Sequence, residues 1–275
     1  MNPTFDPHVH IWRRQFEQFV VGTGRSGADD QVNLVLHLMD QHGVSRACVI
    51  AANSDAEPDN DEYVADLCSR RSDRFVMMSE IDLRSDRRDA LLERTISEWP
   101  ACGLRYGVPP DDSPEAWSGS GHEDFWSRAN EAGLKIALNI AADQVQKLAL
   151  LVERYQRIVW ILDHMARPRF DMPEEEYRPV TDLAVFENAY VKISGFYAFT
   201  QNSDEFPYAD LHPFVVRLRD AYGPERLMWA SDTSPVLDYG SYGQTYACLK
   251  HISALSPTDL EWILGRTARK LFDGA

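Results

Sequence analysis

The sequence is poor in basic residues and in cysteine, and each shortage excludes a class of protein. It contains 28 lysines and arginines against 43 acidic residues, which gives a formal net charge of -15. Such a chain has no charge attraction for nucleic acid or for anionic membrane surfaces. Its four cysteines, at positions 48, 68, 102 and 248, form no CxxC pair, so no cysteine zinc site is predicted. We expect neither nucleic acid nor a membrane as a partner.

Long apolar runs and glycine-rich loops are also missing. No apolar run approaches the roughly 18 residues that suggest a membrane span. The first ten residues, MNPTFDPHVH, have neither the basic nor the apolar region of a signal peptide. We therefore expect a cytoplasmic protein. No glycine-rich phosphate loop follows the first apolar segment, which argues against a dinucleotide-binding fold.

What the sequence does contain is a regular alternation of two kinds of segment. Short apolar segments that favour strands occur at 4–11, 46–52, 75–81, 102–106, 135–140, 158–163, 190–194 and 227–231. Apolar residues at helical spacing occur at 30–42, 61–71, 87–99, 123–132, 144–155, 174–187, 213–222, 242–252 and 258–272. This alternation predicts an α/β fold with parallel strands, and eight strands predict a (β/α)₈ TIM barrel.

The length fits one such barrel, which typically takes about 250 residues. Residues 1–275 are therefore predicted to form a single domain. Residues 107–121 are rich in proline, serine, glycine and aspartate. They are predicted to form a long loop after the fourth strand, on the side of the active site.

Polar side chains stand at the ends of three of the predicted strands. The first strand ends in DPHVH, so His8 and His10, two residues apart, share one face and point into the barrel near its upper end. The sixth ends at His164 and the eighth at Asp232. Active sites of this fold lie at that end of the barrel. Asp232 alone could simply cap a helix, but together the four residues predict a shared catalytic site.

At this point the sequence resembles a known family, the amidohydrolase superfamily, in its branch of lactonases and decarboxylases called amidohydrolase family 2. DPHVHIW, ILDHMARP, VKISGFY and WASDTSP resemble the motifs of its first, sixth, seventh and eighth strands. ILGRTARKLF resembles its closing helix, with Arg266 and Thr267 where Asn-Ala is usual. The resemblance covers essentially the whole chain and implies a barrel hydrolase without specifying a substrate.

The resemblance also implies a metal site, with one departure. Metal-dependent relatives bind a divalent ion through the first-strand histidine pair, a fifth-strand histidine and the eighth-strand aspartate. Asn139 stands at the fifth-strand position here, and an amide oxygen is a poor substitute for imidazole toward zinc. Two possibilities stay open: His8, His10 and Asp232 hold one divalent ion, zinc or manganese, or the enzyme works without metal.

The missing histidine makes the chain similar to the 2-pyrone-4,6-dicarboxylate lactonase-like proteins, which work without metal. Arg105 and Arg167 match arginines that bind substrate carboxylates there, and guanidinium suits planar carboxylates. No arginine follows Gly195, where Tyr197 stands instead. We expect Arg105, Arg167, Asn139 and Tyr197 to bind substrate, a small anionic molecule, while the incomplete arginine set argues against the dicarboxylate itself.

The predicted reaction is hydrolysis of a lactone of a small, carboxylated, aromatic- or sugar-derived acid. Asp232, with a pKa raised or held near working pH, would take a proton from water and later deliver it to the leaving oxygen. His8, His10 and His164 would polarise the carbonyl. One alternative is a metal-dependent decarboxylase of an aromatic or muconate-type acid, and Asn139 counts against it. Another is a binding protein that has lost catalysis. The oligomeric state stays open.

Overall fold

Eight parallel strands form one sheet in the order of the sequence in the computed structural model, which describes residues 3–13, 30–53, 57–110 and 115–273. The strands are β1 Phe5–Val9, β2 Arg46–Ala51, β3 Phe75–Ile81, β4 Ala101–Gly107, β5 Lys135–Asn139, β6 Val159–Leu162, β7 Ala189–Ile193 and β8 Leu227–Trp229. A parallel bridge joins Val9 to Thr233, and the Asp232 amide donates to the His8 carbonyl at 3.0 Å. The sheet therefore closes, and the (β/α)₈ TIM barrel is confirmed.

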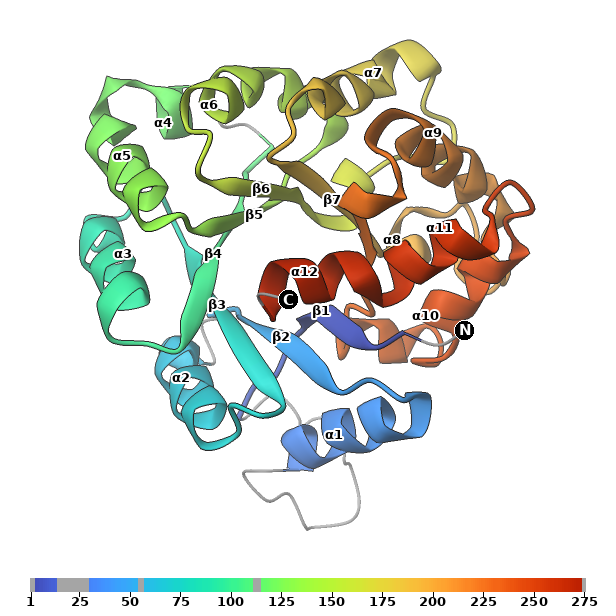
Figure 1. Ribbon diagram of the computed structural model, residues 1–275, viewed down its shortest axis with the longest axis horizontal. Helices are drawn as coiled ribbons and strands as arrows, with labels where there is room; N and C mark the ends of the chain where they lie inside the picture. Colours follow the sequence, from blue (N-terminus) through green and yellow to red (C-terminus); the bar gives the residue numbers. More distant parts are fainter. Residues whose placement is uncertain (1–2, 14–29, 54–56, 111–114, 274–275) are drawn as a thin grey trace.

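Helices surround this barrel (Figure 1). The long ones are α1 Asp30–His42, α2 Asn60–Arg70, α3 Arg88–Ser97, α5 Glu123–Ala132, α7 Glu174–Asp182 and α9 His212–Tyr222. The short ones are α4 Glu115–Ser118, α6 Ala149–Arg154, α8 Phe196–Phe199, α10 Gln244–Ala247, α11 Pro257–Glu261 and α12 Thr267–Phe272. None of the helices in the described ranges is long and apolar enough to cross a membrane.

Two predictions about local structure need correction. The segment 107–121 is not a loop throughout, because it contains α4, where Trp117 is buried and its carbonyl accepts a hydrogen bond from the Trp126 indole at 2.8 Å. Residues 111–114 of that segment lie outside the described ranges. The helix predicted at 258–272 is interrupted between α11 and α12. There Gly265 approaches Thr4 so closely that an added Cβ would lie 2.2 Å from the threonine Oγ1.

The barrel interior is apolar toward the amino-terminal ends of the strands, the lower end, and polar at their carboxyl ends, the upper end. Side chains that alternate along the strands, including Ile50, Met78, Ile161 and Met228, fill the interior with Phe5 and Phe272. The α12 helix lies across the lower end (Figure 1), where the Phe272 ring stacks on Phe5 with centroids 5.3 Å apart. Inward-facing polar residues at the carboxyl ends of the strands therefore meet at the opposite mouth.

Candidate active site

His8 at the end of β1, His10 just after it and the aspartate after β8 meet at the upper mouth of the barrel. The Nε2 atoms of His8 and His10 lie 3.1 Å apart, and Asp232 Oδ1 lies 3.6 Å from each of them. All three residues are buried. The spacing of two residues puts both imidazoles on the inner face of β1, and closure of the sheet brings Asp232 beside them.

His164 reaches the same cluster through an unusual backbone. Residues 164–167 all have positive φ, from 52° to 57°, so the chain turns sharply after β6. The His164 Nδ1 lies 2.8 Å from Ser194 Oγ and 3.9 Å from Asp232 Oδ2. Gly195, the residue after Ser194, has a φ of 74°, and an added Cβ there would lie 3.1 Å from the Cβ of His164. The Ser-Gly pair after β7 thus both orients this imidazole and leaves room for it.

A buried charged network lies beside the cluster. Lys192 is completely buried, with its Nζ 2.9 Å from Asp163 Oδ1 and 3.1 Å from His8 Nδ1. Asp163 Oδ2 accepts a hydrogen bond from Arg105 Nε at 3.1 Å, and Arg105 also contacts Glu80 Oε1 at 2.5 Å. Burial raises the pKa of Asp163, but Lys192, His8 and Arg105 more than offset this and hold it well below its usual value.

The residues predicted to bind substrate differ in their surroundings. Arg105 is buried between Glu80 and Asp163, so its guanidinium is already occupied by two carboxylates. Arg167 is partly exposed and makes no ion pair with any described carboxylate. Asn139 ends β5, two residues after the inward-facing Ala137, and so faces the mouth. A role in substrate binding stays a prediction for each of them.

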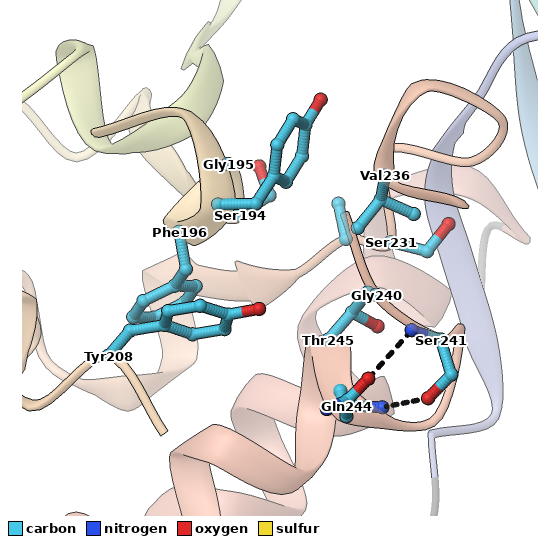
Figure 2. Close-up of a pocket in the computed structure, with 12 residues that line it drawn as sticks. Ser194, Gly195, Phe196, Tyr208, Ser231, Val236, Gly240, Ser241, Gln244 and Thr245 are labelled. Atoms are coloured by element: carbon cyan, nitrogen blue, oxygen red, sulfur yellow. Dashed lines mark hydrogen bonds between the residues drawn. The ribbon is translucent and has the colours of Figure 1, made fainter. Parts of the chain in front are cut away.

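Tyr197 borders Asp232 and also lines a small neighbouring hollow. The Tyr197 hydroxyl donates to Asp232 Oδ2 at 2.7 Å, and its ring stacks on Tyr239 with centroids 4.9 Å apart. Figure 2 shows the hollow between Ser194 and Ser231, which has a volume of about 10 Å³, enough for about one water molecule. The Trp12 ring stacks on His10 with centroids 4.9 Å apart. Aromatic rings thus contact both His10 and Asp232.

The sequence prediction did not include Glu80. This residue lies two positions after the inward-facing Met78 on β3, so the same alternation that identified the other inward residues could have indicated it. Nothing in the sequence indicated its partner, because the pairing depends on the register in which Glu80 of β3 lies opposite Arg105 of β4.

The titratable groups of the cluster favour neutral imidazoles around an ionised carboxylate. Burial lowers the pKa of His8 well below 6.5, lowers that of His164, and lowers that of His10 to about 4. Burial raises the pKa of Asp232, but the three imidazoles and the Tyr197 hydroxyl outweigh it, and the net shift is downward. The expectation of a raised pKa at Asp232 is therefore wrong. Asp232 is ionised at neutral pH and is a weak base.

The geometry of this cluster fits a divalent metal ion. Three donor atoms separated by 3.1, 3.6 and 3.6 Å lie on a circle of radius about 2.0 Å, the length of zinc–nitrogen and zinc–oxygen bonds. Neutral imidazole and carboxylate are also the donor types that zinc takes. His8, His10 and Asp232 therefore form a candidate set of ligands.

Comparison with known proteins places the chain in a family. The sequence model described as amidohydrolase matches residues 5–274, so the chain belongs to the amidohydrolase family. The L-fucono-1,5-lactonase of Burkholderia multivorans is 24% identical over 287 residues, which cover 97% of this chain and 95% of the relative. Membership of this family, together with relatives named as lactonases, makes the chain a hydrolase.

Solved structures share the fold at lower identity. An amidohydrolase from Burkholderia multivorans with bound zinc matches with a TM-score of 0.77 and 20% identity over 98% of this chain and 99% of that one. A probable 2-pyrone-4,6-dicarboxylic acid hydrolase from Acinetobacter baumannii, with citric acid bound, matches with a TM-score of 0.74 and 15% identity over 99% of this chain and 100% of that one. At these identities the likeness shows the fold alone.

Proposed function

We propose that this enzyme hydrolyses a lactone, the cyclic ester of a small acid, with Asp232 as the proton-transferring group. The observation that carries the proposal is the arrangement around Asp232: Oδ2 accepts the Tyr197 hydroxyl, while Oδ1 lies 3.6 Å from both His8 and His10. One oxygen is held in place and the other faces the imidazoles. The lactonase relatives support the same reaction class.

In the proposed reaction, the Asp232 carboxylate takes a proton from the water that attacks the ester carbonyl. The carboxyl group then delivers this proton to the ring oxygen as the carbon–oxygen bond breaks. Where no metal is bound, imidazole N–H groups of the cluster would donate to the developing oxyanion in a buried site where such hydrogen bonds are strong. A metal held by the cluster would take over this role. Arg167 is the predicted arginine that remains available for a substrate carboxylate.

The lowered pKa of Asp232 makes it a weak base for ordinary water, so the attacking water needs to be more acidic. A divalent ion held by His8, His10 and Asp232 would supply this by lowering the pKa of bound water and polarising the carbonyl. We propose zinc or manganese as that ion. The fifth-strand position, Asn139, gives this site one imidazole fewer than the metal-dependent pattern has.

The test combines a metal analysis with kinetics. Bound metal is measured in the purified protein, and a panel of lactones is assayed with and without a chelator. Asp232→Asn is expected to abolish turnover while substrate binding is largely kept, and Asp204→Asn, at an exposed aspartate, serves as the control. Turnover retained in Asp232→Asn would refute the assigned role. Release of carbon dioxide from aromatic acids, with no lactone hydrolysed, would favour decarboxylation instead.

A further inference from the structure

A cavity of about 510 Å³ opens beside the carboxyl ends of β2, β3 and β4, apart from the histidine cluster. Its volume is within the range of sites for small molecules. Asn53, Asp61 and Glu80 line the wall nearest the barrel, and Ile81, Leu91 and Trp99 provide apolar surface. The mechanism proposed above uses none of these residues.

Asp61 is the unusual group in this wall, because it is 95% buried yet only partly satisfied. Its Oδ2 accepts a hydrogen bond from the Asn53 side-chain amide at 2.6 Å, and its backbone N–H donates to Asn53 Oδ1 at 3.2 Å. This reciprocal pairing explains how Asn53 is attached to the start of α2. It does not involve Asp61 Oδ1, which has no hydrogen-bond partner among the described residues. Buried polar atoms in native proteins are seldom left without a partner.

The cavity wall is joined to the catalytic cluster on two sides. Glu80 contacts Arg105 at 2.5 Å, Arg105 contacts Asp163 at 3.1 Å, and Asp163 lies 3.6 Å from His8. On the other side, Asn53 follows Ala52, whose carbonyl accepts the Trp12 indole N–H at 2.9 Å, and Trp12 stacks on His10. These contacts link the cavity wall to the cluster, and Glu80 lies on the same inward-facing side of β3 as Met78.

We propose that Asp61, Asn53 and Glu80 form a subsite for hydroxyl groups, and that the substrate is a polyhydroxylated, sugar-derived lactone. This inference rests on the proposed lactonase function and names its substrate class. Carboxylate and amide groups pair well with hydroxyls, which both donate and accept hydrogen bonds. Burial, together with the nearby charge of Glu80, raises the pKa of Asp61 to about 7, so at neutral pH this carboxyl group is able to accept or to donate.

The charges in the cavity argue against a second carboxylate as the occupant. Asp61 and Glu80 repel an anion at the inner wall. Four arginines also line the cavity. Arg84 pairs with Asp82, Arg88 with Asp89, and Arg94 with Glu62 and Glu98. Arg87 is exposed, away from the inner wall that Asp61 and Glu80 form. The part of the ligand that lies against the inner wall is therefore neutral and rich in hydroxyls.

Kinetic selectivity tests the subsite directly. Hydrolysis of glucono- and galactono-1,5-lactone is compared with that of unsubstituted δ-valerolactone in the wild type, Asp61→Asn, Asn53→Ala and the control Asp59→Asn, which changes an exposed carboxylate at the rim of the cavity. Both subsite variants are expected to lower kcat/KM for the sugar lactones about tenfold, mainly through KM, and to leave δ-valerolactone unchanged. Equal losses on both kinds of lactone, or no loss on either, would overturn the inference.

A binding measurement separates this inference from the proposed reaction. Calorimetric titration with free galactose and fucose is expected to show saturable binding to the wild type and to Asp59→Asn, and binding about tenfold weaker to Asp61→Asn. If the sugars bind in this pattern but no lactone is hydrolysed, the subsite stands and the lactonase proposal fails. If lactones are hydrolysed but the sugars bind all variants alike or none, the subsite is refuted.

Discussion

Replacement of Lys192 by methionine tests the buried network that adjoins His8. The Lys192 ammonium group is completely buried, 2.9 Å from Asp163 and 3.1 Å from His8. Methionine keeps most of the side-chain volume but removes the positive charge, so Asp163 keeps Arg105 as its one remaining cationic partner among the described residues. The carboxylate of Asp163 would then be buried with less compensation.

The size of this effect follows from the cost of breaking a buried ion pair. Removing one partner of such a pair typically destabilises a protein by about 3–5 kcal/mol. Because Arg105 still compensates part of the charge, we expect the lower end of this range, about 3 kcal/mol. This is a large part of a typical total stability of about 5–15 kcal/mol, but it leaves a folded protein to measure.

Urea unfolding at pH 7 provides the free energies, with Lys270→Met as the control because Lys270 is exposed. Asp163→Asn alone and the double variant complete a mutant cycle. The double variant should lose at least about 1 kcal/mol less than the sum of the two single losses. Each single change leaves the charge of the remaining partner buried with less compensation, whereas the double change removes both charges. Additive losses, or a loss below about 1 kcal/mol for Lys192→Met, would refute the network as described.

Three further predictions concern single side chains. Tyr197→Phe removes the hydroxyl that orients Asp232 and should lower kcat for lactones about tenfold with KM little changed; an unchanged kcat would contradict this role. Phe272→Ala removes the ring that stacks on Phe5 and should cost about 3 kcal/mol in urea unfolding while kcat is kept, since α12 lies at the far end of the barrel. For Asp61, the pKa is raised from 3.8 to about 7 on folding, so the stability of the wild type relative to Asp61→Asn is greatest below about pH 4 and falls as the pH rises through 7. Between pH 5 and 8 the difference in unfolding free energy between the two proteins should change by about 2–3 kcal/mol. A difference that stays constant over this range would show that Asp61 has an ordinary pKa in the folded protein.

Much of the fold could be predicted from the sequence because it depends on local periodicity. Short apolar segments identified each strand, and the spacing of His8 and His10 put both imidazoles on one face of the first strand. The two residues beyond them, His164 and Asp232, were placed by their position at strand ends, since all parallel strands of a barrel end at the same mouth. The helix interruption at Gly265 was missed because it depends on contact with Thr4, far away in the sequence.

The chain by itself determined which side chains face the barrel interior and at which end they gather. Only the tertiary structure decided how they pair: that Arg105 is held by Glu80 and Asp163, that Lys192 contacts His8, and that the surroundings lower the pKa of Asp232. Periodicity acts along a few neighbouring residues. Hydrogen bonds and pKa shifts depend on distances of a few ångströms between residues far apart in sequence, which strand register and barrel closure set.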